Sequence, residues 1–137
     1  HYTVPLGSAN VVREGSDVTI VCYGAMVHTA LEAATLAEAE GVEMEIVDVR
    51  SLVPLDTETI AASAQKTGRI VVVHEAPRTC GYGAELIAQI QQRAFWHLEA
   101  PIARVTGFDT PFPHTLEHEY LPDAGRILKA ALETIDS

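Results

Sequence analysis

Cationic side chains are scarce in this sequence: nine Lys and Arg residues stand against nineteen Asp and Glu residues, which gives a formal net charge of −10. Nucleic acids and anionic membranes need a basic binding face, so we expect neither as a partner. Long apolar runs are also missing. No stretch approaches the roughly 18 residues of a membrane-spanning helix, and the N-terminus does not resemble a signal peptide. The acidic balance instead favours a basic protein partner.

Cysteine is scarce as well. The sequence has only Cys22 and Cys80, too few for a disulfide framework. Because Cys22 lies inside an apolar run that predicts a buried strand, we expect reduced thiols in a cytoplasmic or organelle-matrix setting.

The residues that are present predict one globular domain over 1–137, since 47% of them are apolar and 20% are charged. The sequence opens on His1-Tyr2-Thr3-Val4-Pro5, without an initiator Met, which indicates a fragment or a processed product.

Apolar periodicity predicts alternating strands and helices. Buried strands are expected at 18–23 and 70–73, further strands at 42–49 and 102–106, and a short extended piece at 9–13. Helices are expected at 25–39, 57–66, 83–98 and 123–135. The alternation of Glu43 and Glu45 with apolar residues indicates that 42–49 is an edge strand. Such an order predicts an α/β fold with a mostly parallel sheet covered by helices on both faces.

The stretch 69–86 is the first place to look for function, because a strand, a polar turn at 74–78 and two glycines precede a helix. In open parallel sheets, ligands bind at the carboxyl ends of the strands. Gly81 and Gly83 lack the third glycine of a dinucleotide fingerprint, so they predict a tight turn and close strand–helix packing. In the helix, the residues expected to be buried are Leu86, Ile87, Ile90, Ala94 and one of Phe95 and Trp96.

Two short patterns bear on catalysis. Cys80, just ahead of a helix, could act as a thiol nucleophile with His74 as its base, although no third member can be assigned. His114-Thr-Leu-Glu-His118 matches an inverted zinc-protease motif. Prolines surround this motif and leave barely two helical turns, so a polar loop is the preferred interpretation and no metal ligands are assigned.

Four longer motifs occur in a familiar order: 15–26, 48–56, 74–85 and 98–113. In this order they resemble the C-terminal domain of the β subunit of thiamine-diphosphate-dependent 2-oxo acid dehydrogenase E1 components. Asp109-Thr-Pro-Phe-Pro-His114 is most similar to the branched-chain, 2-oxoisovalerate type, and the pyruvate and acetoin types are close neighbours. The resemblance covers essentially the whole chain.

The resemblance implies a transketolase C-terminal-like fold: a three-layer α/β/α sandwich whose five-stranded sheet is mostly parallel with one antiparallel strand. The family enzyme is an α2β2 heterotetramer that decarboxylates a 2-oxo acid on thiamine diphosphate, with Mg²⁺, and acylates the lipoyl group of E2. It works in the bacterial cytoplasm or the mitochondrial matrix. Its cofactor ligands lie in an N-terminal pyrimidine-binding domain that is absent here, so no catalytic, cofactor-binding or metal residue is assigned to this chain.

The family's C-terminal domain also implies the partners: a β-subunit mate across a two-fold axis, the α subunit and the basic subunit-binding domain of E2. Acidic residues are the expected E2 contacts, and the candidates are Glu99, Asp109 and Glu117. Apolar anchors of an interface loop are expected at Phe108, Phe112 and Tyr120. The alternative is a small stand-alone thiol enzyme that uses Cys80 and His74.

Overall fold

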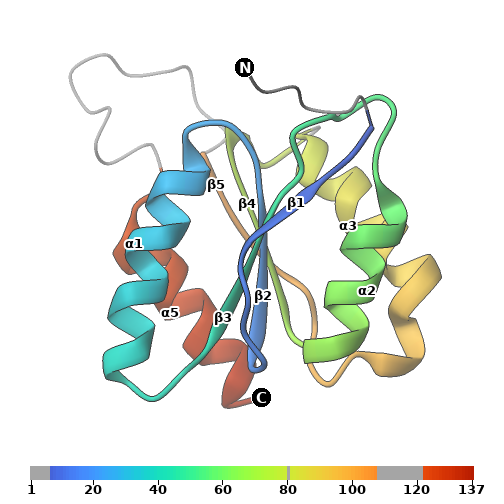
Figure 1. Cartoon of the computed structure of the whole chain (residues 1–137). Coiled ribbons are helices and arrows are strands. Elements are labelled where there is room, and N and C mark those ends of the chain that lie inside the picture. The colour runs from blue at the N-terminus through green and yellow to red at the C-terminus, as the bar shows by residue number, and fades with distance from the viewer. Residues whose placement is uncertain (1–6, 80, 108–121) are drawn as a thin grey trace, which may run out of the picture.

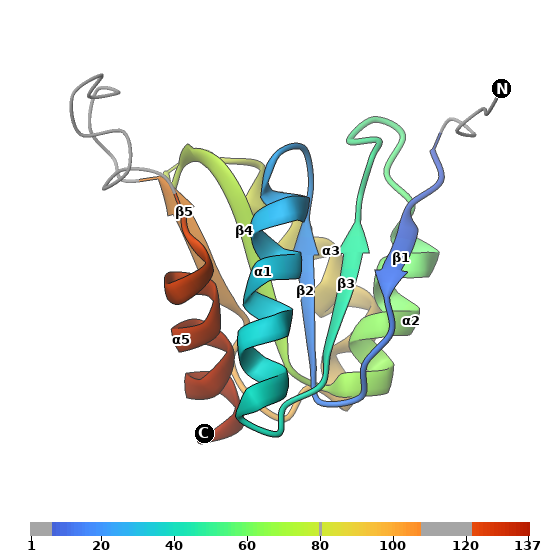
Figure 2. The same ribbon diagram turned by 60° about the vertical axis from the view of Figure 1, so that its left-hand side comes forward.

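Five strands form one sheet in the computed structural model, which describes residues 7–79, 81–107 and 122–137 (Figure 1). The strands are β1 (Asn10–Arg13), β2 (Val18–Cys22), β3 (Met44–Asp48), β4 (Ile70–Pro77) and β5 (Ala103–Gly107). Their spatial order is β1-β3-β2-β4-β5. The four strands β2 to β5 run parallel, and β1 pairs antiparallel with β3 at the edge (Figure 2). The five-stranded sheet predicted with one antiparallel strand is therefore confirmed.

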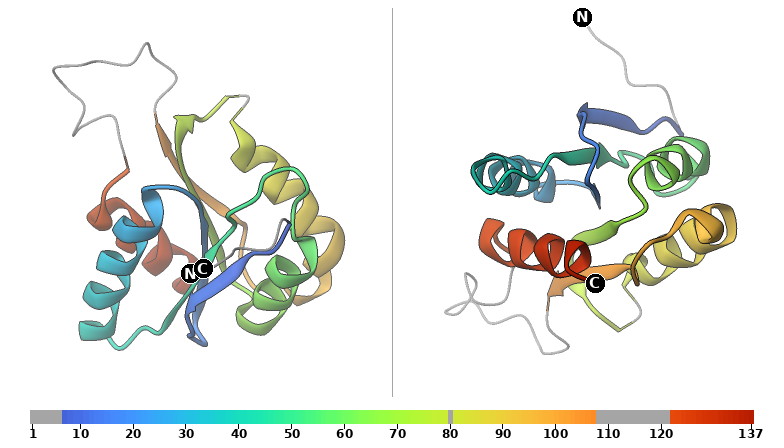
Figure 3. Two further views of the ribbon diagram at one scale, coloured as in Figure 1. Left: turned by 45° about the horizontal axis from the view of Figure 1, so that its top comes forward. Right: turned by 90° about the horizontal axis from the view of Figure 1, so that it is seen from below.

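Helices cover both faces of this sheet. Helices α1 (Met26–Ala39) and α5 (Ala124–Ile135) lie on one face, and α2 (Thr57–Thr67) and α3 (Tyr82–Ala94) lie on the other (Figure 3). A short 3₁₀ turn, η1 (Phe95–His97), follows α3. This is the predicted three-layer α/β/α arrangement. No helix within the described ranges is long and apolar enough to cross a membrane.

Alternation along the strands divides the core in two. On β2, Val18, Ile20 and Cys22 face α1 and α5, whereas Val21 faces α2 and α3. All five residues of β2 are buried. The apolar runs of the sequence therefore correspond to strands packed on both faces, as expected for the interior of a parallel sheet.

The prediction that 42–49 is an edge strand is wrong. Strand β3 lies between β1 and β2, and the true edge strands are β1 and β5. The polar residue that prompted the prediction, Glu45, is 3% exposed, because it points at α2 rather than at solvent. Alternation identified the two faces of β3 correctly, but the buried carboxylate of Glu45 produced the polar pattern of an exposed face.

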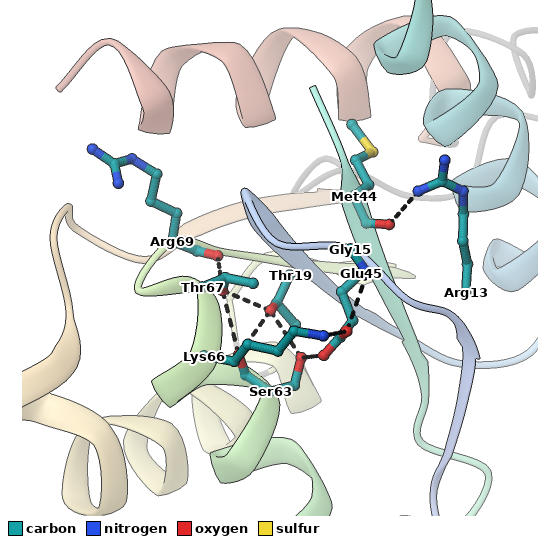
Figure 4. Close-up of polar contacts among 9 residues, drawn as sticks. All are labelled: Arg13, Gly15, Thr19, Met44, Glu45, Ser63, Lys66, Thr67 and Arg69. Carbon is teal, nitrogen blue, oxygen red and sulfur yellow. Dashed lines mark hydrogen bonds and ion pairs between the residues drawn. The ribbon is translucent and has the colours of Figure 1, made fainter. Parts of the chain in front are cut away.

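Glu45 belongs to a polar cluster between β3 and α2 (Figure 4). Its carboxylate accepts hydrogen bonds from Lys66 Nζ at 2.7 Å and Ser63 Oγ at 2.6 Å, and from the Gly15 amide at 3.2 Å. Ser63 Oγ also lies 2.9 Å from the Thr19 hydroxyl, which tethers the cluster to β2. Burial raises the pKa of Glu45, but the hydrogen bonds from its three donors outweigh burial and hold the pKa below its usual value.

Strand β4 and helix α3 end at other residues than the sequence predicts. The polar turn expected at 74–78 is wrong, because β4 continues to Pro77 with an irregular register after Val73. Helix α3 ends at Ala94 rather than near Leu98. By contrast, α2 begins and ends where the sequence indicates. Asp56 accepts a hydrogen bond from the Thr59 amide at 3.1 Å as the N-cap, and Gly68 ends the helix with φ of 71°.

We expect Glu45→Ala to lower the free energy of unfolding by about 1–3 kcal/mol, because the change removes the carboxylate that accepts hydrogen bonds from Lys66 and from the buried Ser63 hydroxyl, which then keeps only its contact with Thr19. Urea denaturation followed by circular dichroism measures this loss. The matched control is Glu43→Ala, since Glu43 is half exposed in a surface ion pair with Arg13 at 3.4 Å. That control should cost less than about 1 kcal/mol. Equal losses in the two variants would contradict a special role for the buried cluster.

Candidate functional site

The carboxyl edge of the sheet has a topological switch point between β2 and β4. The loop after β2 leads to α1 on one face, and the loop after β4 leads to α3 on the opposite face (Figure 1). In open α/β sheets, ligands bind where the loops after two adjacent strands lead to helices on opposite faces of the sheet. Tyr23 follows β2 and His74 lies on β4, and their rings stack here with centroids 6.2 Å apart.

The His74 side chain is completely buried. Its Nδ1 lies 3.1 Å from the carbonyl oxygen of Ala76, and its Nε2 has no hydrogen-bond partner in the described part of the chain. Burial lowers the pKa of His74; the Ala76 bond partly opposes this, and the charge of Arg104 lowers the pKa further. The imidazole is therefore a neutral group packed inside the fold.

The absence of a side chain at Gly83 makes room for the His74 ring beneath α3. A Cβ atom at Gly83 would lie 2.6 Å from His74 Nε2, closer than any normal contact. Tyr82 holds the start of the same helix, because its hydroxyl donates to the Leu52 carbonyl oxygen at 2.7 Å. The close strand–helix packing predicted from the two glycines is thus confirmed at Gly83.

The residues proposed for catalysis are only partly described. Cys80 lies outside the described residues, so its position relative to His74 stays open, as does that of the His114–His118 motif. In the described ranges, no group of three or more His, Cys, Asp or Glu residues could hold a metal ion. Cys22 is a free, buried thiol, and burial, with a smaller effect of Asp48, raises its pKa to about 12. A thiol in that environment is not a nucleophile near neutral pH.

Glu99, the first candidate for partner binding, lies at the opposite, amino edge of the parallel strands. Its carboxylate pairs with the Arg69 guanidinium, and its amide donates to the Gly68 carbonyl oxygen at 2.8 Å. Arg69 also donates to the Thr134 carbonyl oxygen at 3.0 Å, which ties this edge to the end of α5. The Glu99 side chain remains 59% exposed and accessible to a partner. Asp109 and Glu117 lie outside the described residues, as do Phe108, Phe112 and Tyr120.

Two exposed aromatic residues were missed at the sequence level. We expected one of Phe95 and Trp96 to be buried, yet Phe95 is 51% exposed and Trp96 is 91% exposed. The spacing of apolar residues along α3 could have predicted the exposure of Phe95 and Trp96. Leu86, Ile90 and Ala94 recur every four residues and mark the buried face, so the two positions that follow Ala94 fall outside it.

Comparison with known proteins decides the family. The family model described as "Transketolase, C-terminal domain" matches residues 7–127. The chain belongs to the transketolase C-terminal domain family. Its fold agrees, because the chain of a split-gene transketolase, described as an inactive β4 tetramer, superimposes with a TM-score of 0.82 at 32% identity over 98% of this chain and 43% of that one.

Relatives of this transketolase C-terminal domain are E1 β subunits. The chain is 54% identical over 127 residues to the 2-oxoisovalerate dehydrogenase subunit β of Pseudomonas aeruginosa, covering 93% of this chain and 35% of the relative. It is 46% identical over 136 residues to the pyruvate dehydrogenase E1 component subunit β of Staphylococcus aureus, covering 98% and 42%. The chain thus spans between a third and a half of the length of these relatives.

We expect the stability of the domain to fall as pH drops below about 6.5, the usual pKa of histidine. The folded-state pKa of His74 is lowered, so the unfolded chain binds its proton first. The stability contributed by the neutral ring is complete above the unfolded pKa and is lost as pH falls toward the folded pKa. Urea midpoints measured across this range should vary less in His74→Asn. His28→Asn, on the exposed face of α1, should retain the wild-type slope.

A second prediction concerns the glycine against that ring. Gly83→Ala should destabilise the domain by about 1–3 kcal/mol, because the new methyl group overlaps the buried imidazole. Gly125→Ala is the matched control, since Gly125 is likewise the second residue of its helix and, among the described residues, its Cβ would meet only Asp123 Oδ1 at 3.4 Å. Thermal unfolding should show Gly125→Ala to be neutral or stabilising by up to about 1 kcal/mol. A neutral Gly83→Ala would refute the close packing.

Proposed function

We propose that this domain is the assembly domain of the β subunit of a thiamine-diphosphate-dependent 2-oxo acid dehydrogenase E1. The observation that carries the proposal is the 54% identity to a 2-oxoisovalerate dehydrogenase β subunit across 93% of this chain. The proposed partners are the E1 α subunit, a second β subunit and the subunit-binding domain of E2. The split-gene transketolase β chain, which is named as a β4 tetramer, supports pairing between β chains.

The branched-chain type is the proposed activity of the whole enzyme: oxidative decarboxylation of a 2-oxo acid with transfer of the acyl group to the lipoyl group of E2. Identity to three 2-oxoisovalerate dehydrogenase β subunits is 54%, 50% and 46%, and identity to the pyruvate dehydrogenase β subunit is 46%. This preference for the branched-chain type rests on sequence identity to the relatives and not on a substrate pocket within this domain. Relatives from Pseudomonas aeruginosa and from the mitochondria of Dictyostelium discoideum support a cytoplasmic or mitochondrial-matrix setting.

Catalysis is proposed to reside outside this domain. Among the described residues, no group of three or more His, Cys, Asp or Glu residues could hold a metal ion. At the switch point, His74 Nδ1 faces the Ala76 carbonyl oxygen and the ring packs against Gly83, so the imidazole is buried beneath α3. We derive no reaction step through the cofactor from this chain.

Docking of E2 is proposed to depend on charge. The chain carries a net charge of −10, which attracts the basic subunit-binding domain and accelerates its association. Among the three candidates, Glu99 is the one that the structure describes. Its pairing with Arg69 fixes the carboxylate at the surface without covering it. Asp109 and Glu117 remain candidates on the same charge argument.

The proposal is tested by titrating the chain with the subunit-binding domain of E2 by isothermal titration calorimetry. Binding that weakens as salt rises is expected, because surface charges are screened. Glu99→Gln should raise Kd roughly fivefold, whereas Glu32→Gln, an exposed carboxylate on α1, should leave Kd unchanged. Absence of binding, or binding that does not depend on salt, would contradict electrostatic docking.

A further inference from the structure

The two edge strands of the sheet, β1 and β5, differ in how well they are protected against pairing with another strand (Figure 2). At β1, the register with β3 is irregular between Val11 and Arg13. Arg13 also forms ion pairs with Glu38 at 3.6 Å and with Glu43 at 3.4 Å. An irregular edge twists away from a further strand, and the charge on this edge is already neutralised. Strand β1 is therefore a protected edge.

Strand β5 has a more regular edge. Its register with β4 is regular from Ala103 to Val105 and becomes irregular only toward Gly107, and the strand contains no proline. An edge strand presents backbone N–H and C=O groups along its outer side, and no strand of the described ranges pairs there. A hollow of about 250 Å³ lies between β5 and α5. It is lined by Arg104, Val105, Arg126, Lys129, Ala130 and Glu133.

Cationic side chains flank β5 on both faces of the sheet. Val105 packs in the core beneath α1 and α5, so alternation places Arg104 on the opposite face, where its Nη1 donates to a carbonyl oxygen beyond the end of β4 at 3.2 Å. On the α5 side, Arg126 Nη2 donates to a carbonyl oxygen of β5 at 2.8 Å. Lys129 lies one helical turn further along α5 and is exposed, with no hydrogen bond or ion pair to another described residue.

Charge decides which kind of strand this edge can accept. Three of the nine Lys and Arg residues of the chain line the hollow, against one carboxylate, that of Glu133. A basic segment would be repelled there, whereas an acidic one would be attracted. Consecutive side chains of a strand point to opposite faces, so adjacent acidic residues of an added strand would meet Arg104 on one face and Lys129 on the other.

We propose that β5 accepts an extended acidic segment of a partner protein as an additional strand of the sheet. Backbone hydrogen bonds supply the affinity of such strand addition, and the flanking side chains supply the specificity. Arg104 and Lys129 are the residues that select for acid. This partner has the opposite charge to the subunit-binding domain of E2, and it binds at the side of the sheet rather than at Glu99. The inference therefore goes beyond the assembly role.

Fluorescence anisotropy of a labelled acidic peptide, VEEVEEV, titrated with the chain tests this strand addition. The peptide should bind, and its analogue VQQVQQV should bind at least about tenfold more weakly, because it lacks the charges. VEEPEEV keeps every charge but replaces the central residue with proline, which removes a backbone donor and disfavours a strand. This analogue should also lose at least about tenfold in affinity. Equal binding of VEEPEEV would show that charge alone attracts the peptide, and it would overturn strand addition.

Substitutions in the chain identify the binding edge. Lys129→Gln should raise the Kd of VEEVEEV roughly threefold, because one cross-strand charge pair is lost. Arg93→Gln is the matched control, since Arg93 is an exposed cation on α3, and it should keep the wild-type Kd. Circular dichroism verifies that both variants fold. An equal loss of affinity in both variants would overturn the assignment to β5.

Amide hydrogen exchange provides a readout that does not depend on charge. Saturation with VEEVEEV should slow exchange along β5 and leave exchange along β1 unchanged, because added backbone hydrogen bonds protect only the edge that forms them. Unchanged exchange along β5 would contradict the proposal. Lys129→Gln should leave the affinity for the subunit-binding domain of E2 unchanged, so failure of the acidic peptide to bind would overturn strand addition while E2 docking survives.

Discussion

The pairing of β2 with β3 on one side and β4 on the other is the constraint on which the remaining structure depends. All five residues of β2 are buried, and they alternate between the core under α1 and α5 and the core under α2 and α3. A strand packed on both faces has no tolerance for a shift in register, since a slip of one residue would exchange the two sets of side chains. Both helical layers are therefore positioned relative to the same five residues.

Polar groups inside this frame are used to hold layers together. At one end, Glu45 joins β3 to α2 through Lys66 and Ser63. At the other, His74 fills the space that the missing side chain of Gly83 leaves under α3. Both arrangements consume groups that would otherwise suit a reaction, a carboxylate and an imidazole.

Much of the fold was predictable because local rules and tertiary packing agree. The buried strands, the α2 cap at Asp56 and the helix stop at Gly68 follow from apolar runs and capping chemistry. The errors arose where a residue distant in the sequence decides whether a side chain is buried or exposed. Glu45 looked exposed because Lys66, 21 residues away, cannot be paired with it from periodicity. The candidate site was predicted less well: Glu99 was named on charge, but its pairing with Arg69 was not foreseen.

The sequence alone determined the alternation of strands and helices, the acidic charge and the order of motifs that identifies the family, because each depends on residues close together in the chain or on composition. Only the tertiary structure decided which strands are edges, what surrounds Glu45 and His74, and that Trp96 points outward. These properties depend on residues that are distant in sequence and adjacent in space. The burial of a side chain is set by what folds against it, and a helix that ends one turn early leaves Phe95 and Trp96 exposed, in contact with each other.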